Sequence, residues 1–112
     1  MAEETAPQFL YLTTTGRSTG LPRQIEIWFV SYEDAYYLCS EGRDRADWVK
    51  NIRANDRVTI SVGSREAAPL DCRGRTVDPY AEAERAAAVA ARFDAKYGWS
   101  DGLFVELRPI QG

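Results

Sequence analysis

The stretch from Thr13 to Phe29, TTTGRSTGLPRQIEIWF, is the part of this chain best suited to binding an anion. A turn bounded by two glycines carries hydroxyls and guanidinium groups, at Arg17, Ser18, Thr19 and Arg23. Backbone amides, hydroxyls and arginines that converge on one point bind phosphate. The alternative is a hairpin loop whose glycines and proline serve only turn geometry. We therefore treat the turn as a candidate phosphate site.

A second anion-binding feature lies at SEGRDRADW, residues 40–48. Here Asp44 or Asp47 is expected to cap a short helix that runs to about Asn55. The start of a helix offers unpaired amides and the positive end of the helix dipole. Two arginines flank this start, Arg43 and Arg45. Solvated surface charge is the other interpretation of these two side chains.

The chain contains no histidine, which removes several kinds of catalytic chemistry. Ser-His-Asp and Cys-His catalysis are excluded, and a zinc site is disfavoured. The two cysteines, Cys39 and Cys72, lie in separate strand-like runs without paired spacing, so we expect buried, reduced thiols. We therefore name no catalytic side chain.

Length and charge limit the remaining classes of function. A chain of 112 residues, 45% hydrophobic and 28% charged, is typical of one ordinary globular domain. Its net charge of -3 and pI near 5.0 argue against a nucleic acid partner, so any anion site must be local. No apolar run reaches the roughly 20 residues that span a bilayer, and the N-terminus does not resemble a signal peptide. We expect a cytoplasmic protein with no membrane span.

Six short strands and two helices are expected to position these residues. The strands are expected at residues 9–14, 24–29, 36–39, 57–62, 70–77 and 103–107. Gly74 interrupts the fifth strand, where we expect a bulge or tight bend. The longer helix is expected to begin with Asp78 as its N-cap and to end at Gly98. A flexible acidic leader, residues 1–8, precedes a single domain at residues 9–110. These elements predict an α+β fold with a curved antiparallel sheet.

The whole pattern is similar to a known family. YLTTTGRSTGLPRQIEIWF, YYLCSEG, DWVKNIRANDRVTISVG and KYGWSDGLFVELRP together resemble the deazaflavin-dependent nitroreductases. These belong to the FMN-binding split barrels related to pyridoxamine phosphate oxidase. The resemblance covers nearly the whole chain after residue 8. It implies a six-stranded antiparallel split β-barrel, with one short and one longer helix. Such a barrel binds the deazaflavin coenzyme F(420), or less often FMN, in a groove.

The resemblance also implies which residues hold the coenzyme. In the family, the turn after the first strand and the start of the first helix hold the phosphate and the acidic tail. The second strand lies beside the ring system. The implied cofactor-binding residues are Arg17, Ser18, Thr19, Arg23, Glu26, Ile27, Trp28, Ser40, Glu41, Gly42, Arg45, Trp48 and Asn51. Both anion-binding features described above fall within this set.

The chain departs from the family pattern at three positions. Ser18 stands where relatives commonly carry lysine, which predicts weaker attraction for an acidic tail. Asp47 precedes the tryptophan where related short members often have histidine. Several tyrosines line the substrate pocket of the nitroimidazole-reducing members, and Tyr97 is the candidate for one of them here. The resemblance therefore indicates the cofactor better than the substrate.

The expected function is reduction of an electron-poor small molecule, such as a quinone, nitro compound or activated alkene, by hydride from reduced F(420). The cofactor supplies the chemistry, and the protein positions it. Trp28 is expected either to stack near the ring or to fill a dimer interface. The alternatives are an FMN-dependent reductase, a flavin or deazaflavin carrier without turnover, and a structural dimerisation domain. A homodimer is expected because split barrels of this group commonly pair.

Overall fold

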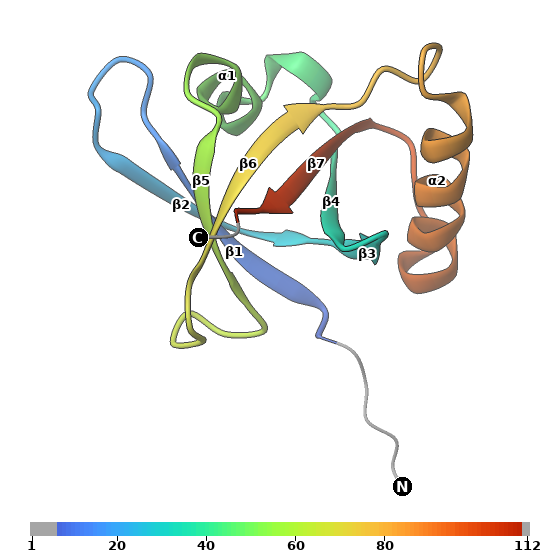
Figure 1. Cartoon of the computed structure of the whole chain (residues 1–112), viewed down its shortest axis with the longest axis horizontal. Helices are drawn as coiled ribbons and strands as arrows, with labels where there is room; N and C mark the ends of the chain where they lie inside the picture. Colours follow the sequence, from blue (N-terminus) through green and yellow to red (C-terminus); the bar gives the residue numbers. More distant parts are fainter. Residues whose placement is uncertain (1–6, 111–112) are drawn as a thin grey trace, which may run out of the picture.

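The computed structural model describes residues 7–110, and most of the predicted leader lies outside this range. Within it, seven strands form one curled antiparallel sheet, in the order β2-β1-β5-β6-β7-β4-β3 (Figure 1). The strands are β1 (Phe9–Thr15), β2 (Pro22–Trp28), β3 (Val30–Tyr32), β4 (Ala35–Ser40), β5 (Arg57–Val62), β6 (Leu70–Thr76) and β7 (Leu103–Pro109). The helices are a short 3-10 turn η1 (Arg43–Arg45), α1 (Asp47–Ala54) and α2 (Ala83–Tyr97). The predicted α+β class and curved antiparallel sheet are confirmed.

The structure has one strand more than the six predicted, because the chain continues as β3 directly after Phe29, where the second predicted strand ends. Phe29 and Val30 are both buried, which interrupts the alternation of inward and outward side chains. The side chains of α2 bind the Phe29 backbone instead of a neighbouring strand. The Phe29 amide donates to the Tyr97 hydroxyl at 3.1 Å, and its carbonyl accepts from Lys96 Nζ at 2.9 Å. The chain therefore continues as β3, at the opposite edge of the sheet from β2.

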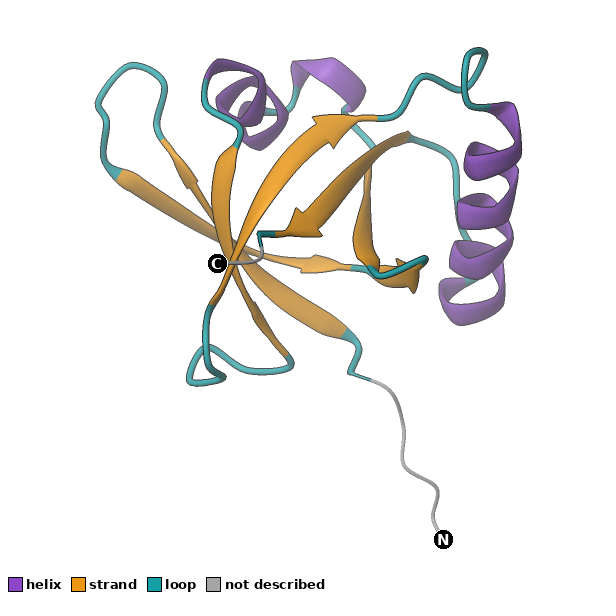
Figure 2. Ribbon diagram, in the orientation of Figure 1, coloured by secondary structure: helices purple, strands orange, loops and turns teal. Residues whose placement is uncertain are grey.

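Two hydrophobic cores lie on the two faces of the curled sheet. On the inner face, α1 inserts Val49 and Ile52 among side chains from β1, β4, β5, β6 and β7. On the outer face lies α2 (Figure 2), and its Phe93 belongs to one core cluster with Tyr37 of β4 and Phe104 of β7. Each such buried side chain stabilises the fold by roughly 1.5–3 kcal/mol. Strands β4 and β7 are covered on both faces, and so they read as nearly continuous buried runs.

Gly74 does not form the predicted bulge. The pairing between β6 and β7 is continuous across it, from Cys72 opposite Pro109 to Thr76 opposite Val105. A Cβ atom at Gly74 would lie 3.0 Å from Cγ2 of Ile52, a contact tighter than most real ones. Glycine is needed here because α1 packs directly on the strand.

The two predicted N-caps are wrong, although both helices exist. Helix α1 begins at Asp47 without a side-chain cap. Asp78 Oδ1 accepts hydrogen bonds from the amides of residues 80 and 81, in a turn before α2 begins at Ala83. The predicted end of α2 at Gly98 is confirmed, with φ at +74°.

Both cysteines are buried and free, as predicted. Among residues 7–110 neither helix combines the length and apolarity needed to cross a membrane.

A buried carboxylate, that of Glu106 on β7, joins the sheet to the start of α2. Its side chain is 5% exposed and accepts hydrogen bonds from Tyr37 Oη at 2.6 Å and Arg75 Nε at 3.0 Å. Arg108 Nη2 donates a further bond at 3.1 Å, and Arg75 also pairs with Glu82. Burial alone would raise the pKa of Glu106, but these hydrogen bonds outweigh burial and lower it to about 2.

Replacing this carboxylate with an amide tests its contribution to stability. We expect Glu106→Gln to lower the free energy of unfolding at pH 7 by about 2–3 kcal/mol, which corresponds to the depressed pKa. Because the folded pKa is depressed, the contribution is complete above about pH 4.3 and is lost as the pH falls toward 2. Urea denaturation at pH 7 and between pH 5 and 2.5 measures both effects. The control is Glu66→Gln, in an exposed loop. A constant difference across this pH range would contradict the assignment.

Candidate functional site

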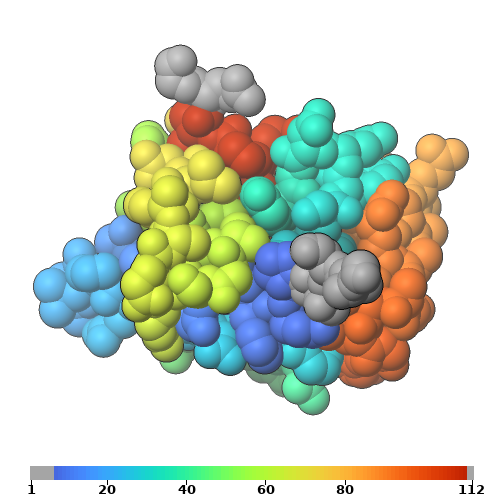
Figure 3. Space-filling model, turned by 90° about the horizontal axis from the view of Figure 1, so that it is seen from below, coloured from blue at the N-terminus to red at the C-terminus, as the bar shows by residue number. Residues whose placement is uncertain are grey.

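A cavity of about 660 Å³ lies between α1 and the tip of the hairpin that joins β1 to β2. We call it the turn cavity, and its lining is Thr14, Gly16, Arg17, Ser18, Thr19, Pro22, Arg23, Gln24, Ile25, Asp47, Trp48 and Asn51. In the space-filling view the hairpin tip (light blue) projects beyond the body of the molecule (Figure 3). The cavity thus brings together the glycine-bounded turn and the start of the short helix, which the sequence singled out separately.

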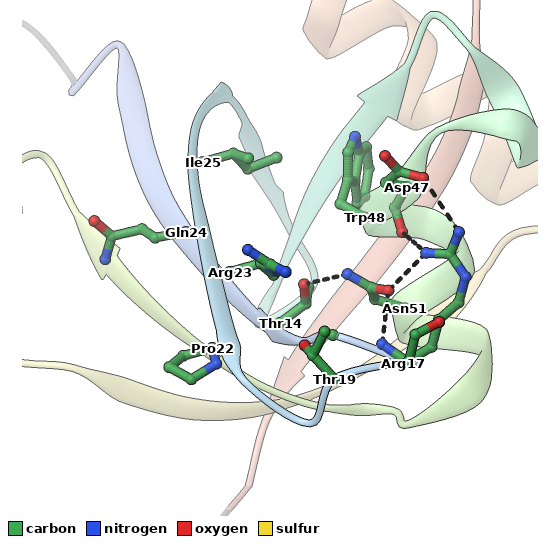
Figure 4. Close-up of a pocket in the computed structure, with 12 residues that line it drawn as sticks. Thr14, Arg17, Thr19, Pro22, Arg23, Gln24, Ile25, Asp47, Trp48 and Asn51 are labelled. Atoms are coloured by element: carbon green, nitrogen blue, oxygen red, sulfur yellow. Dashed lines mark hydrogen bonds and ion pairs between the residues drawn. The ribbon is translucent and has the colours of Figure 1, made fainter.

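Asn51 fixes the position of the turn against α1. Its side chain is buried, with 4% of the residue exposed. Its Nδ2 donates to Thr14 Oγ1 at 3.1 Å, at the end of β1. Its Oδ1 accepts from the Arg17 amide at 3.2 Å and from Arg17 Nη1 at 2.8 Å (Figure 4). One buried amide therefore holds the strand end, the turn backbone and a guanidinium group in place.

The glycines and Thr19 also serve the geometry of the turn itself. The Gly16 amide donates to the Leu21 carbonyl, and the Gly20 amide to the Gly16 carbonyl, each at 2.8 Å. Gly20 has φ at +72°, which favours glycine. Thr19 Oγ1 accepts from the Leu21 amide at 3.2 Å. The turn-geometry interpretation is thus correct for these residues, but it leaves the two arginines unexplained.

The two arginines of the cavity differ in their partners. Arg17 Nη2 lies 3.2 Å from Asp47 Oδ1, and both groups are partly open to solvent. Arg23 forms no ion pair or side-chain hydrogen bond with any residue from 7 to 110. It projects from β2 toward α1, on the same face as Ile25 (Figure 4). Arg23 is therefore available to an anionic ligand as the structure stands.

A second cavity, of about 540 Å³, lies farther along β2, where β2 faces β4 across the opening of the sheet. We call it the aromatic cavity, and its lining is Phe9, Glu26, Ile27, Trp28, Cys39, Glu41, Phe93 and Trp99. Trp28 is 40% exposed and stacks on Tyr97, with ring centroids 4.3 Å apart and planes 4° from parallel. Two carboxylates and no arginine or lysine line this cavity. It suits a flat, uncharged molecule.

Burial makes two titratable groups beside this cavity, Cys39 and Tyr97, unsuited to acid–base chemistry. Burial raises the pKa of the Cys39 thiol to about 12, so the thiol stays protonated and is a poor nucleophile. Burial also raises the pKa of Tyr97. The Tyr97 hydroxyl accepts from the Phe29 amide and lies 2.7 Å from the Gln8 carbonyl, so its hydrogen bonds go to the backbone. The role of Tyr97 is therefore to stack on Trp28 and hold that ring in place.

The structure gathers most of the predicted site residues in these two cavities. The turn cavity includes Arg17, Ser18, Thr19, Arg23, Trp48 and Asn51. The aromatic cavity includes Glu26, Ile27, Trp28 and Glu41. Three predicted residues line neither cavity, namely Ser40, Gly42 and Arg45. Ser40 is buried and its hydroxyl donates to the Arg43 carbonyl at 2.9 Å, while Arg45 is exposed on η1. All thirteen assignments remain predictions about a ligand.

Sequence reasoning missed several lining residues. Phe93 and Trp99 enter the aromatic cavity from α2 and the loop after it, far along the chain from β2. Phe93 is fully buried in the outer core, so it contributes only to the base of this cavity. Asp47 was assigned as a helix cap or a departure from the family pattern, whereas its carboxylate pairs with Arg17.

Comparison with known proteins gives one family match and several solved structures of similar fold. A family model described as F420H(2)-dependent quinone reductase matches residues 3–101. No protein of curated function matches the chain. The heme storage protein HutZ from Vibrio cholerae is 20% identical, with a TM-score of 0.73 over 94% of this chain and 83% of that one.

Two other solved structures share the fold. A candidate pyridoxamine 5'-phosphate oxidase from Listeria innocua is 13% identical, with a TM-score of 0.70 over 93% of this chain and 85% of that one. A structure described as an F420 reductase is 21% identical, with a TM-score of 0.64 over 95% of this chain and 89% of that one. At such identities the likeness establishes the fold alone, and it confirms the predicted split barrel.

Removing the buried amide of the turn cavity should destabilise the protein. We expect Asn51→Ala to lower the free energy of unfolding by about 1–3 kcal/mol, because the buried Thr14 hydroxyl and the Arg17 amide lose their partner. Urea denaturation measures the change. The matched control is Asn55→Ala at the end of the same helix, where the amide is exposed. Equal losses in the two variants would show that Asn51 has no special role.

Proposed function

The chain belongs to the F420H(2)-dependent quinone reductase family, and from this premise we propose that it transfers hydride from reduced F(420) to an electron-poor small molecule of the quinone, nitro or activated-alkene class. The observation that carries the proposal is the position of the two cavities along one strand. Arg23, near the start of β2, lines the turn cavity, and Trp28, at its end, lines the aromatic cavity. A ligand with a phosphate at one end and a planar ring at the other suits this arrangement.

The turn cavity is the proposed site for the phosphate. Arg23 offers a guanidinium that has no ion-pair partner among residues 7–110, and Arg17 lies across the cavity with its backbone amide held by Asn51. Hydrogen bonds between arginine and phosphate are charge-assisted and stronger than those between neutral groups. Ser18 adds a hydroxyl at the exposed rim. These groups were predicted from the sequence, and the structure brings them into one cavity.

The ring system is proposed to lie along β2, toward the aromatic cavity. In the described sheet β2 is an edge strand, so one side of its backbone is free to hydrogen-bond the polar edge of a ring. Reduced deazaflavin supplies a hydride when bound. The chain's own side chains orient the reactants and exclude water, for which Trp28 and Trp99 provide apolar surface. Because the coenzyme supplies the hydride and the side chains only position the reactants, the reaction requires no acid–base pair from the protein.

Binding of the coenzyme and the role of Arg23 are tested together. We expect F(420) to quench tryptophan fluorescence at micromolar concentration and to bind less tightly as salt rises. Arg23→Ala should weaken binding by roughly 10- to 100-fold, the loss expected for a charge-assisted hydrogen bond. Arg92→Ala, on the exposed face of α2, is the control and should leave binding unchanged.

The same titration with FMN distinguishes the flavin-dependent alternative. No binding of either ligand up to high micromolar concentration would overturn the proposal. Tight binding without reduction of any acceptor would favour the carrier. Light scattering on the same sample tests the predicted homodimer.

The charge of the aromatic cavity should set a preference among acceptors. Glu26 and Glu41 both line it, and they repel an anionic acceptor. We expect a neutral naphthoquinone to be reduced with higher kcat/KM than its sulfonated analogue. The double variant Glu26→Gln, Glu41→Gln should reduce this preference roughly tenfold, since each charge contributes about threefold at 5–6 Å in water. Oxidation of reduced F(420), followed by absorbance, gives the rates, and Glu66→Gln is the control. An unchanged preference would place the acceptor elsewhere.

A further inference from the structure

We propose that the carboxylate of Asp47 lowers the affinity of the turn cavity for a phosphomonoester dianion more than for a phosphodiester monoanion, and so narrows the advantage that the two arginines give to the more highly charged ligand. This inference rests on the proposed function, since it concerns the phosphate of the same ligand. Asp47 thereby determines specificity, whereas other residues of the cavity bind the anion.

The geometry places this carboxylate inside the anion site. Asp47 is the first residue of α1 and lines the turn cavity, with its side chain 86% exposed. Its Oδ1 lies 3.2 Å from Arg17 Nη2, and its backbone carbonyl accepts from Arg17 Nη1 at 3.4 Å. One face of the Arg17 guanidinium is therefore already bound to an anion of the chain itself (Figure 4).

The charges that line the cavity determine what it can neutralise. Its charged lining residues are Arg17, Arg23 and Asp47, so one net positive charge faces the ligand. Asp47 therefore cancels part of the attraction that the two arginines exert on a phosphate. A phosphomonoester carries nearly two charges at pH 7 and leaves the second one beside the Asp47 carboxylate.

The cost of this repulsion scales with the charge of the ligand. Two like charges about 5 Å apart in water repel enough to weaken binding roughly threefold to fourfold. A dianion at the same place meets about twice the repulsion, which corresponds to roughly tenfold. Asp47 should therefore separate two ligands that differ only in the charge of their phosphate, such as FMN and its monomethyl ester.

Asp47→Asn is the decisive variant, because asparagine has the same shape and keeps an oxygen that can accept from Arg17. The probes are FMN, FMN monomethyl ester and riboflavin, each titrated by tryptophan quenching at low salt. We expect the variant to bind FMN about tenfold more tightly and the ester about threefold more tightly, with riboflavin unchanged. Asp47→Glu, which restores the charge, should restore the discrimination. The matched control is Asp44→Asn, an exposed acid on η1 that does not line the turn cavity.

The outcomes separate this inference from the proposed function. Equal changes for FMN and its ester, or no change for either, would overturn the role of Asp47 while F(420) still binds the unaltered protein. Failure of F(420) and all three probes to bind any variant would overturn both. Raising the salt concentration should remove the difference between the unaltered protein and Asp47→Asn. Asp47→Ser, which also removes the charge, replaces the asparagine variant if that variant unfolds.

Discussion

The two edges of the curled sheet are joined through one residue, Phe29, and the rest of the architecture depends on this closure. Strands β2 and β3 lie at opposite ends of the strand order, yet only Phe29 separates them in the chain. Such a connection is possible only when the sheet curls until its edges meet. Tyr97 and Lys96 stabilise the crossing by binding the Phe29 backbone. A backbone amide and carbonyl that left the sheet are thus satisfied by side chains of α2.

The closure places β2 opposite β4 and leaves an opening between them, and that opening holds the aromatic cavity. The contact between the Tyr97 hydroxyl and the Phe29 backbone also explains the stacking of Trp28 on Tyr97. Tyr97 must lie beside Phe29 to bind its backbone, and its ring then covers the neighbouring Trp28. The position and the rigidity of the aromatic wall formed by Trp28 and Tyr97 therefore follow from the way the sheet closes. An aromatic wall fixed in this way needs no reorganisation when a planar ring binds.

Local patterns of the sequence predicted six of the seven described strands, α2 and the glycine-bounded turn between β1 and β2, because each depends on neighbours a few residues apart. The structural features that the sequence did not predict depend on contacts between residues far apart in the chain. The break at Phe29 requires Tyr97, which is 68 positions away, and Asp47 is drawn from helix capping to Arg17, 30 positions away. Gly74 looks like a bulge until Ile52 is placed against it. Ser40 lines neither cavity because it is buried at the end of β4, where its hydroxyl bonds the Arg43 carbonyl, and Arg45 is exposed on η1.

Strand β2 also gives the site a direction. From Arg23 to Trp28 an extended strand rises about 3.3 Å per residue, or about 17 Å in all, enough for a phosphate-bearing chain and a ring placed end to end. The cationic groups lie at one end of this path, and the carboxylates of Glu26 and Glu41 lie at the other. A ligand with an anionic tail and an uncharged ring is favoured in one orientation, and the reversed orientation brings its anion against two carboxylates. The charges at the two ends of β2 would thus favour one orientation of such a ligand before any contact with the ring is made.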